Sequence, residues 1–134
     1  MTEVQKAYIA GIVDGEGSIS IAHSKHKNNG KRYYSLRIDV VNTDRKLIDY
    51  MADVTDTGYT YCYESRKNEW KNIHSWVTTR KSAEEFLREI LPYLVIKKER
   101  AELALEFRKH SRKVEKQEQF FEKMKALNKR GAIK

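Results

Sequence analysis

The chain has 134 residues, of which 40% are hydrophobic and 34% are charged, as expected of one globular domain with a charged exterior. Lys and Arg outnumber Asp and Glu by 27 to 19, and the net charge of +8 favours nucleic acid as partner, with an anionic membrane surface second. The single cysteine, Cys62, excludes an internal disulfide and argues against a thiolate zinc site. No segment reaches the roughly 20 apolar residues that span a bilayer, and no signal peptide is recognisable, so we expect an intracellular protein, in the cytoplasm or an organelle.

The N-terminal segment predicts a helix. Thr2 and Gln5 form a capping box, and apolar residues then recur at helical spacing. We expect this helix to cover about residues 3–15 and to end at Gly17, because glycine readily stops a helix.

Two alternating segments predict a β-hairpin over residues 18–25 and 34–41, joined by a turn at Asn29-Gly30. On the second strand one face would carry Tyr34, Leu36, Ile38 and Val40, and the other Ser35, Arg37 and Asp39.

The middle of the sequence repeats this order. Thr43 or Asp44 caps a helix to about residue 54, which Gly58 stops, and two strands over residues 59–65 and 70–79 form a second hairpin.

The remaining segments predict helices. A capping box at Ser82 and Glu85 opens one that Pro92 interrupts, and residues 98–109 and 115–128 are charged and amphipathic. The element order predicts an α+β domain whose antiparallel sheet carries helices on one face. We assign this domain to residues 1–110, with a basic helical extension of the same domain over residues 111–134.

The segment IAGIVDGEG, residues 9–17, carries the functional signal. Gly11 and Gly15 share one helical face, and each lowers helix stability by about 1 kcal/mol relative to alanine, so close packing of another helix is expected. Asp14 and Glu16 bring carboxylates to the helix end that already carries partial negative charge. An acidic residue in such a place is often a metal ligand, because a bound cation reverses the local electrostatics; a solvent-exposed acid is the alternative interpretation.

This segment resembles, position by position, the nine-residue signature of the LAGLIDADG homing endonucleases. The element order over about residues 3–110 also fits that family, and LPYLVIK, residues 91–97, is similar to the segment before its C-terminal helix. The resemblance implies the LAGLIDADG fold, αββαββα with a four-stranded antiparallel saddle-shaped sheet and helices on one face. Glu16 stands where the family usually has Asp, which moves the carboxylate by about one bond length.

The resemblance implies how this protein acts. Because the motif occurs once, it implies a homodimer packed through Tyr8, Gly11, Ile12 and Gly15. Each chain would bring Glu16 to a central site, where Mg²⁺ (or Mn²⁺) is held by carboxylates and by backbone carbonyls such as that of Gly15. The implied activity is hydrolysis of a long, partly palindromic double-stranded DNA site, as in intron or intein homing, with metal-activated water.

The family also places polar side chains around the scissile phosphates. By position, the resemblance assigns this catalytic role to Lys97, with Lys98 as the neighbouring alternative, and to Asn42 and Arg45. The competing interpretation is an ordinary phosphate-binding or surface lysine for Lys97 and a solvated helix residue for Arg45.

Both hairpins are expected to contact DNA, because a β-ribbon fits the major groove. The outward side chains of the first hairpin are Ser20, Ser24, Ser35, Arg37 and Asp39. The second hairpin offers Tyr61, Tyr63, His74, Trp76 and Arg80, although its alternation does not separate the two faces and the tyrosines could instead pack within the strand. Basic side chains near the hairpin tips, expected on phosphates, are Lys25, Arg32, Arg66 and Lys71.

Two other functions remain open from the sequence. A LAGLIDADG maturase would bind intron RNA, and a DNA-binding module would hold a palindrome-like site without cutting it. The segment over residues 109–134 is expected to be a charged, solvated helix, with phosphate contact as the alternative.

Overall fold

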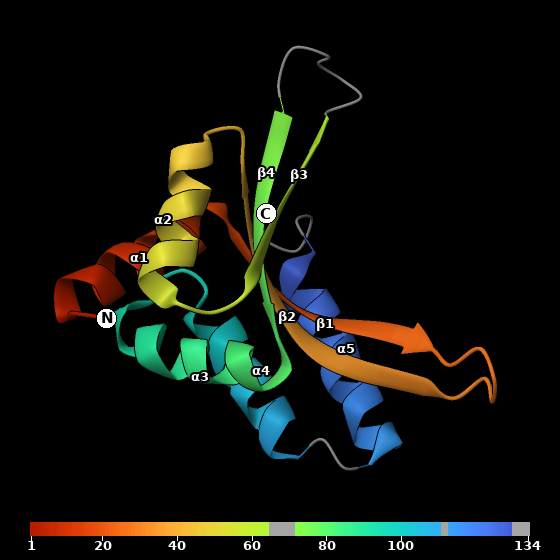
Figure 1. Ribbon diagram of the computed structural model, residues 1–134. Helices are drawn as coiled ribbons and strands as arrows, with labels where there is room; N and C mark the ends of the chain where they lie inside the picture. The colour runs from red at the N-terminus through yellow and green to blue at the C-terminus, as the bar shows by residue number, and fades with distance from the viewer. Residues whose placement is uncertain (65–71, 111–112, 130–134) are drawn as a thin grey trace.

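Helices and strands follow one another in the order that the sequence predicts. The computed structural model describes residues 1–64, 72–110 and 113–129. Its elements are α1 (Glu3–Glu16), β1 (Gly17–Lys25), β2 (Arg32–Asn42), α2 (Arg45–Thr55), β3 (Tyr59–Glu64), β4 (Asn72–Thr79), α3 (Arg80–Ile90), the 3₁₀ helix η1 (Leu91–Tyr93), α4 (Lys98–Lys109) and α5 (Val114–Asn128). The predicted α+β architecture is confirmed (Figure 1). Within the described ranges, no helix is long and apolar enough to cross a membrane.

The four strands form one antiparallel sheet in the order β1-β2-β4-β3. The two hairpins meet through β2 and β4 and then diverge, one toward the side and one upward in Figure 1. One face of the sheet packs against the helices, and its fully or almost fully buried side chains are Ile19, Ile21, Leu36, Ile38, Val40 and Trp76. The alternation predicted for β1 and β2 is therefore confirmed. The other face, called here the open face, carries the side chains between them.

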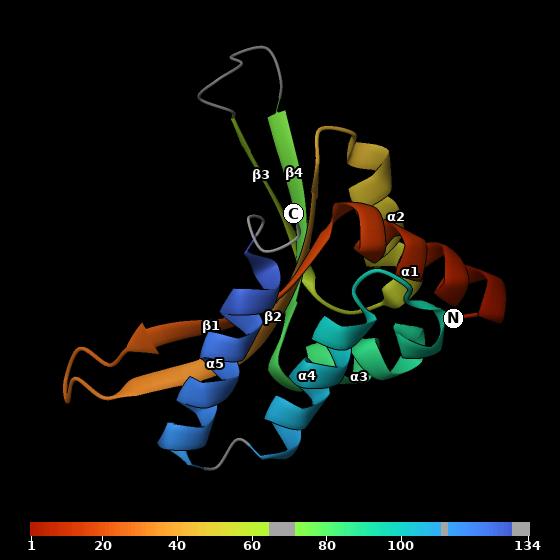
Figure 2. The same cartoon turned by 180° about the vertical axis from the view of Figure 1, so that it is seen from behind.

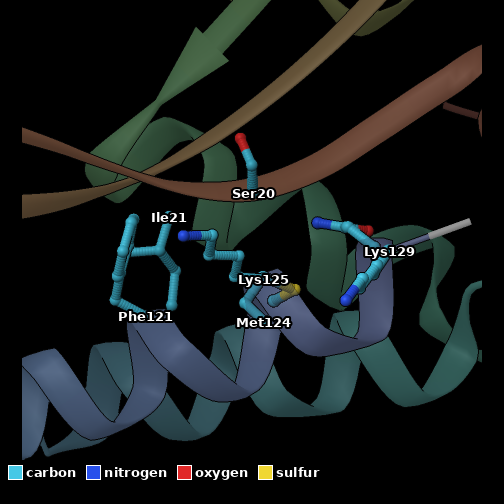
Figure 3. A pocket seen from close by; sticks show the side chains of 7 residues that line it. Ser20, Ile21, Phe121, Met124, Lys125 and Lys129 are labelled. Atoms are coloured by element: carbon cyan, nitrogen blue, oxygen red, sulfur yellow. The ribbon is translucent and has the colours of Figure 1, made fainter. Parts of the chain in front are cut away.

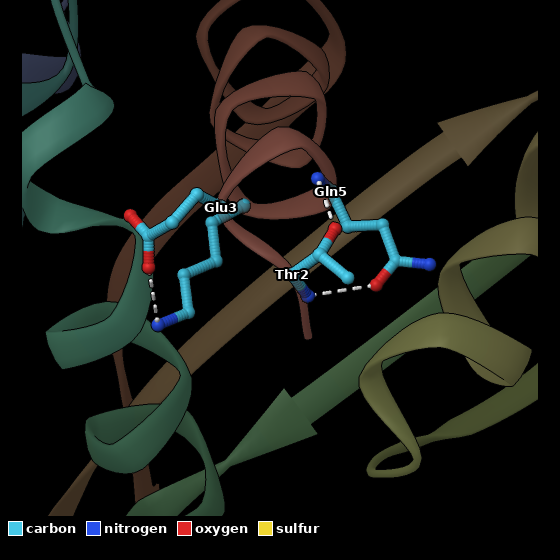
Figure 4. A network of polar contacts seen from close by, with 4 residues as sticks. Thr2, Glu3 and Gln5 are labelled. Carbon is cyan, nitrogen blue, oxygen red and sulfur yellow. Dashed lines mark hydrogen bonds and ion pairs between the residues drawn. The ribbon is translucent and has the colours of Figure 1, made fainter.

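Helix α1 begins and ends as predicted. The backbone N–H of Gln5 donates to Thr2 Oγ1 at 3.1 Å, and the N–H of Thr2 donates to Gln5 Oε1 at 2.9 Å (Figure 4). At the other end Gly17 has an extended backbone, so its conformation does not require glycine. A Cβ there would lie 2.9 Å from the backbone of Val13, and this close approach is what a side chain would disturb.

Two predicted helix-end signals are wrong. Helix α2 ends at Thr55, close to the predicted end near residue 54, but its C-cap is Asp56, whose φ of 51° is left-handed, and not Gly58. Helix α3 begins at Arg80 without a side-chain cap, so Ser82 and Glu85 do not form the expected capping box. The reason is that Thr79 is still paired with Arg37 in the sheet, and the chain turns directly from β4 into the helix.

The C-terminal helix α5 packs along the β1–β2 hairpin (Figure 2). Met124 is almost fully buried in the common core. The Asn128 side-chain amide donates to the carbonyl of Ile19 at 2.9 Å, and Arg100 donates to the carbonyl of Leu127 at 2.9 Å. The expectation of a merely solvated helix is therefore wrong for its inner face, because one apolar stripe completes the core beside β1.

Candidate functional site

One side of the C-terminal half of α1 contains both motif glycines, Gly11 and Gly15. Apart from the adjacent residues and the backbone of α1 itself, no atom of the described residues would lie within 4 Å of a Cβ added at Gly11 or Gly15. Tyr8, on the same face, is 58% exposed, whereas Ile12 is half-buried against the core. This face of α1 therefore has room for a closely packed helix, which none of the described helices supplies.

The two motif carboxylates have different surroundings. Glu16 is the last residue of α1 and is exposed. The Asp14 carboxylate instead accepts three backbone N–H groups: from Val95 at 2.9 Å, Ile96 at 3.2 Å and Lys97 at 2.9 Å. These residues immediately precede α4, so Asp14 connects the end of α1 to the start of α4.

Lys97 makes the reverse connection. Its ammonium donates to the carbonyl oxygens of Val13 at 3.0 Å and Asp14 at 2.7 Å, in the last turn of α1. That turn contains no basic residue of its own, so Lys97 supplies the positive charge that a helix C-terminus favours. Burial and the charge of Arg100 hold the pKa of Lys97 below its ordinary value, although the carboxylates of Asp14 and Glu16 act in the opposite direction.

The donor groups at this end of α1 suit a hard divalent cation only in part. The carboxylate of Glu16 and a carbonyl such as that of Gly15 are the oxygen ligands that Mg²⁺ or Mn²⁺ takes. Both oxygens of Asp14 already accept N–H groups. Within the part of the chain that the structure describes, no cluster of three or more His, Cys, Asp or Glu side chains could hold a metal. One chain thus provides part of a ligand set, which a second Glu16 would extend.

Asn42 and Arg45 make their contacts within the start of α2. The side-chain oxygen of Asn42 accepts the N–H of Asp44 at 2.8 Å, and Arg45 pairs with Asp49 at 3.4 Å. Asn42 also lines a hollow with Tyr8. The structure therefore brings Lys97 to the end of α1 through direct contacts, whereas the contacts of Asn42 and Arg45 lie elsewhere.

The centre of the open face holds a polar network around Arg37. Its Nε donates to Asp39 Oδ2 at 3.2 Å, and its cross-strand partner is Ser20. Burial lowers the pKa of the Arg37 guanidinium, but hydrogen bonds and charge from Asp39 and then Tyr61 outweigh it and raise that pKa. Ser35 lies on the same face by register. This network holds the Arg37 guanidinium where a ligand bound to the open face would contact it.

An exposed tyrosine column lies beside this network on β3. Tyr59 and Tyr61 stack with ring centroids 6.2 Å apart, and Tyr61 and Tyr63 with centroids 6.0 Å apart. All three rings are exposed, and their β4 partners Val77, Ser75 and Ile73 lie on the open face.

Two predicted DNA contacts of β4 lie on the opposite side of the sheet. Trp76 is fully buried, packs edge-on against Phe86 and donates from its indole N–H to the carbonyl of Thr57 at 2.9 Å. It cannot reach DNA without unfolding, so that prediction is wrong. His74 shares this helix-facing side by register and is half-buried. Only the strand register assigns these side chains to a face, because polar and apolar residues do not alternate regularly along the β4 sequence.

The other predicted contacts lie near the hairpin ends. Lys25 and Arg32 are exposed register partners at the end of the first hairpin, next to the exposed Ser24. Arg80 is exposed at the start of α3. Arg66 and Lys71 lie outside the described residues.

Two lysines that the sequence did not single out lie beside the sheet. Lys125 on α5 and Lys129, the C-cap residue that follows α5, border a cavity of about 520 Å³ whose wall includes Ser20 on β1 (Figure 3). Their spacing of four residues was visible in the sequence, but only the packing of α5 along β1 shows that they lie near Ser20.

Comparisons with known proteins agree with this geometry. The family model described as LAGLIDADG endonuclease matches residues 9–102. Among solved structures, the homing endonuclease I-CvuI in complex with its target is similar with a TM-score of 0.80 and 18% identity, over 93% of this chain and 82% of that chain. The archaeal intron-encoded homing endonuclease I-Vdi141I complexed with DNA has a TM-score of 0.76 and 13% identity, over 96% and 87%. I-SmaMI bound to cleaved DNA has a TM-score of 0.69 and 14% identity, over 94% of this chain but 44% of that chain. No curated protein matches the sequence.

Proposed function

The chain belongs to the LAGLIDADG endonuclease family, and from this premise we propose that it is a homodimeric, divalent-metal-dependent endonuclease that cuts a long, partly palindromic double-stranded DNA site. The observation that supports the proposal is the arrangement of residues at the C-terminal end of α1. There an exposed Glu16 follows a glycine-containing face that the described residues leave uncovered, and Lys97 lies beside Glu16.

Two copies of the chain are needed for this function. The chain spans 44% of the I-SmaMI chain, which is bound to cleaved DNA, so two copies would have roughly the extent of that single chain. Packing through Tyr8, Gly11 and Gly15 would place the two α1 helices side by side and their Glu16 residues close together. Two close carboxylates repel each other, and this repulsion is relieved when a cation lies between them.

Several residues of the chain would then have separate roles in the reaction. Glu16 and the carbonyl of Gly15 would hold a divalent ion, which when bound activates water and offsets charge on the phosphate oxygens. The Lys97 ammonium has three N–H donors, of which two are used by α1 carbonyls, so one remains for a phosphate or an ordered water. Asn42 and Arg45 would act at most from the periphery.

The open face of the sheet would read the DNA. Arg37 is held by Asp39 and Tyr61, which lowers the entropy that it loses when it pairs with a base edge. Lys25 and Arg32 at the hairpin end, and Lys125 and Lys129 at the C-terminal end of α5, flank this face and would bind phosphates. The complexes of I-CvuI and I-Vdi141I with DNA support DNA as the ligand of this fold.

The experiment that tests this function is cleavage of a randomised duplex library with Mg²⁺ or with a chelator, followed by sequencing of the cut ends. We expect one long, nearly symmetric site that is cut only with metal. Glu16→Gln should lower the rate by more than about a hundredfold and leave DNA binding nearly intact. Glu118→Gln, an exposed change on α5, is the matched control and should cut like the parent.

The other outcomes identify the alternatives. Tight duplex binding without cleavage by the parent would indicate a non-cleaving module. Preference for structured RNA over duplex DNA would indicate a maturase. Cleavage by Glu16→Gln at the parental rate would show that the catalytic assignment is wrong.

A further inference from the structure

Five hydrogen bonds join two segments that lie more than 80 residues apart in sequence. Asp14 accepts three N–H groups from residues 95–97, and Lys97 donates twice to the carbonyls of Val13 and Asp14. We call these five reciprocal hydrogen bonds the α1–α4 clasp. The two residues exchange roles: the carboxylate binds the N-terminal side of α4, and the ammonium binds the C-terminal end of α1.

The clasp lies at one end of each helix: it includes the N–H of Lys97, the N-cap residue of α4, and the carbonyls of Val13 and Asp14 in the last turn of α1, while Val95 and Ile96 precede α4. The N–H groups at a helix start carry partial positive charge and favour a carboxylate, whereas the last carbonyls carry partial negative charge and favour a cation. Helix α4 has no side-chain cap of its own at Lys97, and the last turn of α1 has no basic residue. Asp14 therefore places a carboxylate beside the N-cap residue of α4, and Lys97 supplies the cation that the last turn of α1 lacks.

The clasp lies next to Glu16. Only Gly15 separates Asp14 from Glu16, and the charge of Glu16 acts on the Lys97 ammonium. Because Asp14 holds the backbone of Lys97 and Lys97 holds the carbonyls of residues 13 and 14, the Lys97 ammonium and the backbone at the end of α1 cannot shift relative to each other without breaking these bonds. The Glu16 side chain begins two residues after Asp14, so this backbone sets the point from which it extends.

We propose that Asp14 is a positioning residue, which through the α1–α4 clasp fixes Lys97 and the end of α1 relative to each other and so sets the geometry of the cleavage site. This inference rests on the proposed function. Asp14 itself touches neither DNA nor metal in this assignment, because both of its carboxylate oxygens are used by backbone N–H groups.

The first test separates catalysis from binding. In Asp14→Asn an amide NH₂ group replaces one acceptor and faces an N–H donor, which should break part of the clasp. We expect kcat on the selected site to fall roughly 10- to 100-fold, as small displacements of reacting groups do, while the Kd for DNA changes by less than about threefold. The matched control Asp53→Asn, an exposed change on α2, should keep the parental kcat. Unchanged kcat in Asp14→Asn, or equal losses in kcat and DNA affinity, would overturn the proposal.

A double-mutant cycle tests whether Asp14 acts through Lys97. If it does, Asp14→Asn should lower kcat far less in a Lys97→Met background than in the parent, because the connection is already broken. Multiplicative losses in the double variant would show that the two residues act independently and contradict the clasp.

Amide hydrogen exchange provides a readout that needs no cleavage. The N–H groups of residues 95–97 should exchange slowly in the parent, although Val95 and Ile96 are exposed by 81% and 68%, because Asp14 holds them. Fast exchange in the parent would refute the clasp even if the enzyme cuts DNA. Slow exchange in a parent that cuts no DNA would leave the clasp established but contradict its catalytic purpose together with the proposed function.

Discussion

A leucine in place of Gly11 should have opposite effects on the stability of the isolated chain and on a dimer packed through α1. Among the described residues nothing lies within 4 Å of a Cβ at this position, so the chain itself should accept the side chain. Leucine also favours a helix over glycine by about 0.8 kcal/mol. Gly11→Leu should therefore leave the monomer folded and slightly more stable.

The same change should disrupt a dimer. In a two-fold interface the leucine occurs twice, and overpacking of a close contact destabilises by about 1–3 kcal/mol per site. The sum of about 2–6 kcal/mol corresponds to a dissociation constant raised by about 30-fold to more than 10,000-fold. The stability of the chain and its self-association should thus change in opposite directions.

Sedimentation equilibrium over a concentration series measures the association, and thermal unfolding by circular dichroism, at one fixed concentration in the monomer range, measures the stability. Ala126→Leu, an exposed change on α5, is the control for an added surface leucine and should alter neither property much. A Gly11→Leu protein that dimerises like the parent and cuts DNA would refute packing through this face.

Three further predictions follow from the core, the charges and the basic edge of the sheet. Met124→Ala should destabilise the fold by about 2–5 kcal/mol, because Met124 is 1% exposed; a loss below about 0.5 kcal/mol in denaturant unfolding would mean that α5 is not part of the core. Hydrogen bonds from Arg108 and then Arg88 hold the pKa of Glu84 below its ordinary value, so its contribution is present above the unfolded pKa and is lost as pH falls through the folded one. Glu84→Gln should accordingly be less stable than the parent near neutral pH, and this difference in stability should disappear as the pH falls below the folded pKa of Glu84; parallel pH–stability curves would contradict this. Changing both Lys125 and Lys129 to Ala should reduce the slope of log K against log salt for DNA binding by about 1.8 per chain; an unchanged slope would exclude phosphate contact at α5.

Local patterns were sufficient where an element depends on its own residues. The capping box of α1 and the two-residue alternation of β1 and β2 specify those elements, because helix ends and half-buried strands need particular residues at particular spacings. The motif over residues 9–17 likewise indicated the family, which the family model matches.

Three features were decided only by tertiary structure. Asp14 and Glu16 are two carboxylates at one helix end, and local sequence does not show which of them accepts hydrogen bonds from the backbone. Asp14 does so because it meets N–H groups 81 to 83 residues away. Trp76 and Tyr61 both suit a strand surface, and the register of β4 against β2 and β3 places one in the core and the other on the open face. Lys125 belongs beside Ser20 only because α5 packs on β1. In each case the physical reason is the same: a side chain's role is set by the partner it meets, and that partner comes from a distant part of the chain.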